Sequence, residues 1–284
     1  MARDVGAAEI APFARDWERA GDIPKALWPK LAALGFGGLY VPEASGGTGL
    51  SRLDATLVFE ALAMACPAVS SFLSIHNMVA RMVDRYGSDT QRAEWLPRLC
   101  TMEAVASYCL TEPGSGSDAA ALRTRAAAAG NGWRLTGTKA FISGGGYSDL
   151  YLVMARSGAP GPKGISAYLV QDGAEGLSFG GLEDKMGWRA QPTRAVQMDD
   201  TPGTLLGTEG QGFSYAMGGL DGGRLNIAAA ALGGAQAALD ATLAYMADRQ
   251  AFGQRLDQFQ ALQFRLADME VRLSASRVFL RHAA

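Results

Sequence analysis

Residues 108–118 read Tyr-Cys-Leu-Thr-Glu-Pro-Gly-Ser-Gly-Ser-Asp, and this stretch decides how the rest of the chain is interpreted. A short apolar run ends there in a Pro-Gly-Ser-Gly turn, whose glycines let the backbone come close to a bound molecule. The hydroxyls of Thr111 and Ser117 would then face the polar edges of a planar ligand. An ordinary glycine-containing turn is the alternative, and the turn alone does not separate the two. The residues of the stretch alone leave both interpretations open, a ligand-binding loop at the end of a strand and an ordinary turn.

The loop belongs to a segment, residues 106–215, in which apolar residues follow the period of strands. Short runs bounded by Gly, Pro, Asp or Ser predict strands over 133–136, 151–155, 165–170, 177–179 and 195–198. Their close spacing predicts a compact antiparallel β domain, either a barrel or a sandwich.

The preceding segment, residues 1–105, shows the period of helices. Ser51 followed by Asp54 is typical of a capping box and predicts a helix start. Gly87 follows an apolar pattern and predicts a helix end. We expect helices over 24–34, from 51 onward, over 72–86 and over 89–99.

The last segment, residues 216–284, is helical again and carries two apolar stripes. One stripe contains Leu225, Leu232, Leu239 and Met246, and the other contains Phe259, Leu262, Leu266, Met269 and Leu273. Two amphipathic helices are too few to cover each other's apolar faces, and no capping Gly or Pro follows Leu280. We therefore expect an α+β chain with an N-terminal helical domain, a central β domain and a truncated C-terminal bundle. The stripe over 259–273 should be exposed.

Composition narrows the function classes. A 284-residue chain with 48% hydrophobic and 19% charged residues is ordinary for a soluble globular protein. Its formal net charge of −2 gives no electrostatic reason to expect nucleic acid or an anionic membrane as partner, and no apolar run approaches a membrane span. The three cysteines show no C-x-x-C spacing, so we expect a reducing, cytoplasmic setting. Two histidines and no G-x-S-x-G motif argue against a histidine-based metal cluster or hydrolase.

Residues 108–118 resemble the first signature of the acyl-CoA dehydrogenases along their whole length. A second match is Lys139-Ala-Phe141-Ile-Ser143-Gly, and the resemblance extends over essentially all of the chain. The runs Gly187–Val196 and Asp221-Gly-Gly-Arg224 resemble the branch of the family that acts on isobutyryl-CoA. The resemblance implies an FAD-dependent oxidoreductase of fatty-acid or valine breakdown, with three domains of the kinds just described.

The resemblance also implies which residues bind FAD. Phe141 would pack on the flavin face and Ser143 would hydrogen-bond near N5, whereas Arg249 would bind the pyrophosphate of a neighbouring subunit's flavin. Without the resemblance, Phe141 would be read as a core aromatic and Arg249 as a solvated cation. The full set is Tyr108, Cys109, Leu110, Thr111, Glu112, Gly114, Ser115, Gly116, Ser117, Phe141, Ile142, Ser143, Arg249, Phe252, Phe259 and Gln260.

The implied substrate residues are Ser117, Asp221, Gly222, Gly223 and Arg224. In the family the segment at 221–224 touches the acyl-CoA, and the small residues at 222 and 223 suit a short or branched acyl group. A helix start with Asp221 as its N-cap is the structural alternative, and both can hold together.

The family's reaction requires a base for the α-proton of the thioester, and relatives supply a glutamate. Most place it in a late Glu-Gly-Thr, which the 284 residues do not contain, and a minority place it immediately before the arginine, where Gly223 stands. Glu112 and Asp221 are poor substitutes, so no catalytic base is assigned and little dehydrogenase activity is expected. The implied partners are an acyl-CoA, an electron-transfer flavoprotein and further copies in a homotetramer. A straight-chain butyryl-type enzyme and a non-catalytic flavin- or CoA-binding protein remain the alternatives.

Overall fold

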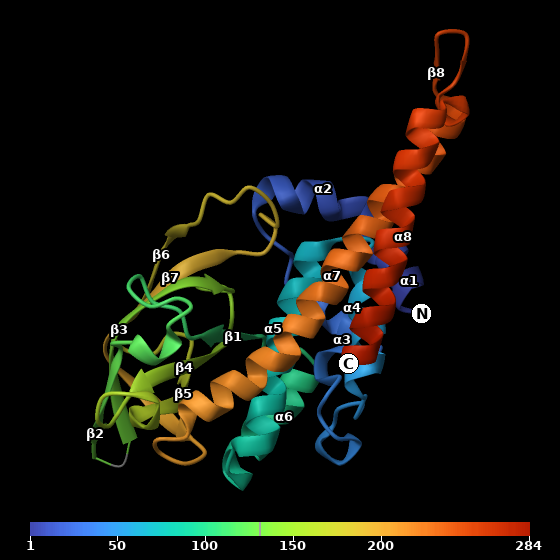
Figure 1. The fold of residues 1–284 in the computed structure, drawn as a ribbon. Coiled ribbons are helices and arrows are strands. Elements are labelled where there is room, and N and C mark those ends of the chain that lie inside the picture. Colours follow the sequence, from blue (N-terminus) through green and yellow to red (C-terminus); the bar gives the residue numbers. More distant parts are fainter. Residues whose placement is uncertain (131) are drawn as a thin grey trace.

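The computed structural model describes residues 1–130 and 132–284. Its elements follow the predicted order, with helices first, a β domain in the middle and two long helices at the end (Figure 1). The long helix α7 runs from the β domain across the N-terminal helices and leads to a hairpin that projects from the body of the molecule (Figure 1).

The N-terminal part consists of α1 (Ala2–Val5), α2 (Ala11–Ala20), α3 (Leu27–Ala32), α4 (Arg52–Ala63), α5 (Pro67–Tyr86) and α6 (Asp89–Cys100). A π-helical stretch, Gly6–Ile10, joins α1 to α2. The predicted capping box is confirmed, because the Asp54 amide donates to the Ser51 hydroxyl at 3.1 Å. Helix α5 ends before Gly87 as predicted, but it begins at Pro67, because proline is well suited to a first helical turn.

The β domain contains β1 (Ala106–Cys109), β2 (Arg125–Ala129), β3 (Gly132–Ser143), β4 (Leu150–Arg156), β5 (Ile165–Gln171), β6 (Leu177–Leu182) and β7 (Thr193–Leu206). Pairings run from β4 to β5, β7, β3 and β2, and a bridge from β2 back to β4 closes the ring into a small barrel. β1 extends the sheet beyond β4, and β6 pairs with β7.

The sheet is not wholly antiparallel as predicted, because β1 lies parallel to β4. Parallel neighbours need a long crossover, and here the connection contains the 108–118 loop and the whole β2–β3 hairpin. The 108–118 loop therefore follows β1 and lies beside the barrel formed by the other strands.

The C-terminal part contains α7 (Gly212–Asp248), the short strands β8 (Gln250–Ala251) and β9 (Gln254–Arg255), and α8 (Gln260–Ala283). Helix α7 begins at Gly212, upstream of the predicted start, and its N-cap Gln211 makes no side-chain hydrogen bond. Asp221 consequently lies inside the helix, so its predicted role as an N-cap is wrong. The β8–β9 hairpin was not predicted.

Helix α7 is long and apolar enough, by length and composition alone, to cross a membrane. The sequence expectation that no run approaches a span is therefore wrong in this respect. Core helices of soluble proteins pass the same test, and α7 packs along α4, α5 and α8.

A buried histidine links the N-terminal helices to the β domain. His76 on α5 has no exposed surface, and its Nε2 lies 3.1 Å from the Gly37 carbonyl and 3.0 Å from the Leu99 carbonyl. Its Nδ1 accepts the Ala106 amide of β1 at 3.2 Å. Burial lowers the pKa of His76 to about 4, so the ring is neutral and Nε2 carries the proton.

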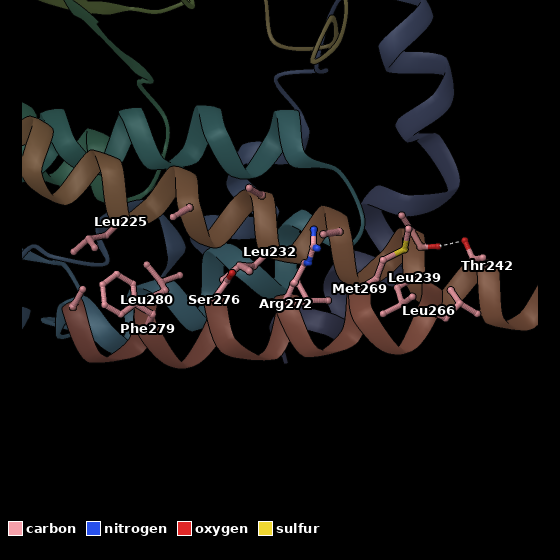
Figure 2. Close-up of a pocket in the computed structure, with 16 residues that line it drawn as sticks. Leu225, Leu232, Leu239, Thr242, Leu266, Met269, Arg272, Ser276, Phe279 and Leu280 are labelled. Carbon is pink, nitrogen blue, oxygen red and sulfur yellow. Dashed lines mark hydrogen bonds between the residues drawn. The ribbon is translucent and has the colours of Figure 1, made fainter. Parts of the chain in front are cut away.

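An apolar groove of about 850 Å³ lies between α7 and α8. Figure 2 shows leucines of both helices pointing into it, among them Leu232, Leu239 and Leu266. The predicted stripe over 259–273 is only partly exposed, since Leu273 is buried against α7 while Met269 is exposed. Helix α8 exposes a further row that the sequence reading overlooked, at Phe264, Val271 and Val278.

Candidate active site

The 108–118 loop leaves strand β1 and forms a tight turn of its own. Glu112 and Ser115 exchange backbone hydrogen bonds of 3.0 and 3.1 Å, and the Ser115 hydroxyl donates to the Asp118 carbonyl at 2.6 Å. A Cβ added at Gly114 or Gly116 would meet nothing within 4 Å. The chain itself therefore does not require these glycines, and their backbone is open to an external molecule.

The second motif lies directly beside this loop. The Ala140 amide donates to the Thr111 carbonyl at 2.8 Å, and the β3–β7 register shifts between Lys139 and Ile142. Phe141 sits at this β-bulge with a φ of 58°, and 66% of its surface is exposed. A left-handed conformation is strained for a bulky residue, and bulges often redirect a side chain beside a functional site. Phe141 is thus displayed as a flat apolar surface rather than buried in the core.

A buried ion pair ties the two motifs together. The Lys139 ammonium is fully buried and donates to Glu112 Oε1 at 2.8 Å and to the Leu110 carbonyl at 3.0 Å. The amides of Arg123 and Thr124 donate to the same carboxylate at 2.6 and 2.9 Å. Burial opposes the charge of Glu112, but the lysine and these hydrogen bonds outweigh it and lower the pKa of Glu112. The Glu112 side chain is therefore ionised, and its two oxygens already accept hydrogen bonds from Lys139, Arg123 and Thr124.

The other residues predicted around the flavin divide between the protein interior and the surface. Cys109 is fully buried, and burial raises the pKa of its thiol to about 12. Leu110, Ser115 and Ile142 are also buried, whereas Gly114, Gly116 and Ser117 are exposed and Thr111 and Ser143 lie half-buried. The Tyr108 hydroxyl is buried and has no hydrogen-bond partner in the described part of the chain.

These features fit a flavin. An unpartnered buried hydroxyl needs an acceptor or donor from outside the chain, because an unsatisfied polar group is unfavourable. An open glycine backbone and a displayed aromatic ring supply the hydrogen bonds and the flat contact that a ring system such as that of FAD uses. Backbone and side chains of residues 108–117 and 141–143 would hold it.

The predicted substrate segment lies on α7. Asp221 and Arg224 are exposed and form an ion pair of 2.9 Å. Gly222 faces α4, where an added Cβ would lie 1.6 Å from Arg52 Nη1, so a side chain here would displace the Arg52 guanidinium. Leu220, next to this segment, and Tyr108 both pack against the core cluster that joins α5, α6, the sheet and α7.

The remaining predicted FAD residues are far from this site. Arg249 follows α7, Phe252 forms the hairpin tip with a φ of 51° and 97% exposure, and its ring lies 6.4 Å from that of Phe259. Gln260 begins α8 and is exposed. The 37 residues of α7 separate this group from the β domain by about 55 Å. One chain therefore does not bring the two halves of the predicted FAD site together (Figure 1).

Sequence reasoning missed the role of Lys139. A lysine within an apolar strand was a usable signal, because a buried ammonium needs a carboxylate partner. The partner, Glu112, stands 27 residues earlier, and no periodicity connects the two positions.

Comparison with known proteins gives consistent results. Residues 1–103, 107–201 and 210–284 match the N-terminal, middle and C-terminal domains described for acyl-CoA dehydrogenases. The chain is 52% identical to a protein named isobutyryl-CoA dehydrogenase, mitochondrial, from Dictyostelium discoideum and 50% identical to one of the same name from Bos taurus. All of this chain and 69% of each relative are covered.

Two solved structures are similar throughout. One, entitled as an electron transferring flavoprotein of Acidaminococcus fermentans, is 36% identical with a TM-score of 0.96, covering 99% of this chain and 76% of the other. The other, butyryl-CoA dehydrogenase from Megasphaera elsdenii, is 35% identical with a TM-score of 0.95, covering 100% and 76%.

The predicted cytoplasmic location is contradicted by these comparisons. The relatives from Dictyostelium discoideum and Bos taurus, 52% and 50% identical over the aligned residues, carry the word mitochondrial in their names. Cysteine usage does not distinguish the two compartments, because both keep buried thiols reduced, and Cys66, Cys100 and Cys109 are all buried and free.

Proposed function

Because this chain belongs to the acyl-CoA dehydrogenase family of oxidoreductases, we propose that it binds FAD and serves the α,β-dehydrogenation of a short branched acyl-CoA of the isobutyryl type. The names of the two relatives at 52% and 50% identity support the choice of substrate. The observation that carries the flavin site is Phe141, displayed on a strained bulge beside the 108–118 loop.

The chain's own residues would divide the work as follows. FAD, when bound, accepts the hydride that leaves the β-carbon of the substrate. Phe141 offers a flat apolar contact, Tyr108 offers a hydroxyl that lacks a partner among the described residues, and the backbone at Gly114 and Gly116 has open space beside it. The Lys139–Glu112 pair holds the two strands that carry these groups in one arrangement.

For the substrate we propose the surface around Asp221 and Arg224. The guanidinium and the carboxylate hold each other in place, so a polar group of the acyl-CoA would meet an oriented pair. A straight-chain butyryl substrate is the second candidate, favoured by the similarity to butyryl-CoA dehydrogenase from Megasphaera elsdenii.

A calorimetric titration of the FAD-loaded protein with isobutyryl-CoA and with butyryl-CoA separates the two candidates. The branched assignment predicts tighter binding of isobutyryl-CoA by about tenfold, the size of effect expected when one methyl group of the C4 isomer does not fit its place in the pocket. Equal affinities would remove the branched-chain assignment.

We further propose that the 284-residue polypeptide binds its ligands but turns them over slowly. Glu112 is not available as a base because Lys139 and two backbone amides hold its carboxylate, and Asp221 lies on the exposed surface of α7 rather than in an enclosed site. Anaerobic addition of isobutyryl-CoA to the yellow protein tests this point. Rapid bleaching of the flavin would show that a base is present and would contradict the proposal, whereas a colourless protein would contradict FAD binding itself.

We also propose an electron-transfer flavoprotein as the electron acceptor and a homo-oligomer as the working form. The similarity to the structure entitled as an electron transferring flavoprotein supports the first. The distance between the 108–118 loop and Arg249 supports the second, because a second copy is needed to bring such an arginine to the pyrophosphate.

A further inference from the structure

Three arginines converge on a small cavity on the opposite side of α7 from Asp221 and Arg224. At 100° per residue, Gly222 faces away from Arg224, and Gly219 lies toward the same side as Gly222. Arg52 of α4 and Arg81 and Arg85 of α5 line the cavity together with Tyr40, Tyr86 and Gly219.

The guanidinium groups are gathered around aromatic rings. The Cζ atoms of Arg52 and Arg81 lie 4.7 and 5.9 Å from the centre of the Tyr40 ring, and that of Arg85 lies 5.4 Å from the Tyr86 ring. Tyr40 is itself fixed, since its hydroxyl donates to Asn226 at 2.8 Å and its carbonyl accepts from Arg81 at 3.2 Å. The rings therefore hold the cations in defined positions.

No carboxylate neutralises this group. Within residues 1–130 and 132–284, none of the three arginines forms an ion pair. Other half-buried arginines of this fold are well supplied with acceptors. Arg277 pairs with Glu60 at 2.6 Å, and Arg156 donates to the carbonyls of Ala120, Leu122, Ala159 and Gly161. Arg81 donates to one carbonyl only, that of Tyr40, and neither Arg81 nor Arg52 has a carboxylate partner among the described residues, so their mutual repulsion is left for an external anion to offset.

The size of the cavity limits the ligand. Its volume of about 30 Å³ holds two water-sized atoms. Two oxygens at one edge of a carboxylate or phosphate match this space, and guanidinium groups bind such an edge with two parallel hydrogen bonds. The remainder of the ligand would stay in solvent, so a nucleotide base or an acyl chain is too large to enter.

We propose that the cavity bounded by Arg52, Arg81 and Arg85 is an anion site that takes an oxyanion group, a carboxylate or a phosphate, on the opposite side of α7 from the proposed substrate surface. The site is independent of the flavin site. Gly222 and Gly219 leave room for it, because side chains there would displace the ends of Arg52, Met78 and Met82.

Calorimetric titration of the full chain with inorganic phosphate, and separately with acetate, tests the site at constant ionic strength. Saturable binding is expected for at least one probe, and the probe that binds identifies the source of the oxyanion. Arg52→Gln and Arg81→Gln should weaken binding about tenfold or more, because each removes a charge-assisted contact. Arg15→Gln is the matched control, since Arg15 is an exposed arginine on α2 and should bind as the unaltered protein does.

Arg85→Gln guards against a folding defect, because its side chain is exposed and forms no ion pair in the described residues. It should weaken binding with an unchanged circular dichroism spectrum, even if Arg52→Gln fails to fold. The absence of saturable binding by both probes would overturn the proposal. So would binding that Arg15→Gln weakens as much as Arg81→Gln does, because that result means general charge attraction.

Discussion

At the scale of single residues, the site depends on one strained aromatic. Phe141→Gly should stabilise the flavin-free protein by about 1 kcal/mol, because glycine adopts a φ of 58° without strain and the phenyl ring is mostly exposed. The same change should weaken FAD binding by about tenfold through loss of the ring contact. Urea unfolding and quenching of flavin fluorescence measure the two effects.

Trp188→Gly is the matched control for this prediction. Trp188 has a φ of 56° but is not among the residues predicted to contact the flavin, so its replacement should leave FAD affinity unchanged. If Phe141→Gly bound FAD as the unaltered protein does, the bulge would have no part in the flavin site.

The Glu112–Lys139 pair leads to a second residue-scale prediction. Glu112→Gln should lower the free energy of unfolding by about 3–5 kcal/mol, because it leaves the buried ammonium without its counter-charge. Glu112→Gln with Lys139→Met should recover most of that loss. Urea unfolding of both single variants and the double variant gives the coupling, and strictly additive effects would mean that the two side chains act independently.

His76 gives the fold a defined pH dependence. Its folded pKa of about 4 lies below its ordinary value of 6.5, so the unfolded chain binds the proton more readily and stability falls as the pH drops below 6.5. The expected loss between pH 7 and pH 5 is about 2 kcal/mol. His76→Gln should flatten this dependence in urea unfolding, whatever its absolute stability; an unchanged slope would assign the effect to carboxylates.

At the scale of elements, the glycines of α7 have unequal roles. A Cβ at Gly233 would lie 2.1 Å from the Glu60 carbonyl of α4, so Gly233→Ala should destabilise the protein by about 2 kcal/mol through overpacking. Gly218 is exposed with open space around it, and Gly218→Ala should stabilise the helix by about 0.5–1 kcal/mol. Thermal unfolding of the two variants should shift in opposite directions, and equal shifts would mean that α7 does not pack on α4 this closely.

Elements with local end signals were predictable from the sequence. The α4 start at Ser51 and the α5 end at Gly87 follow from capping chemistry within a few residues. The α7 start was missed because Gln211 makes no side-chain cap, and β2 was missed because four of its five residues are alanines, which favour helices. Strand pairings and the bulge at Phe141 depend on residues far away in the sequence, which no local pattern records.

The candidate site was predictable to a similar extent. The two motifs around Thr111 and Phe141 were expected separately, and the structure places them side by side through one backbone hydrogen bond. The support that Lys139 gives these motifs was not expected, nor were the three arginines around Tyr40 and Tyr86, because burial and charge pairing become visible only in three dimensions.

At the scale of the whole molecule, the two predicted halves of the FAD site lie at opposite ends of α7 (Figure 1). Neither Arg249→Ala nor Phe141→Gly alone should bind FAD tightly. When the two variants are mixed and allowed to reassociate, roughly a quarter of the tight sites should return. In that share of sites, random pairing joins the intact Phe141 of one copy to the intact Arg249 of the other. Flavin fluorescence after mixing measures the recovery, and no recovery at any ratio would place Arg249 outside the flavin site.

The length of α7 also bears on how readily a single copy could pass electrons to oxygen. On the proposed arrangement, a copy that has not yet met another holds the ring end of its cofactor but not the phosphate end, and releases it readily. Such an unassembled copy would carry no tightly bound reduced flavin, and therefore could not transfer electrons from it to oxygen. On this arrangement, the length of one helix would make redox activity depend on assembly with a second copy.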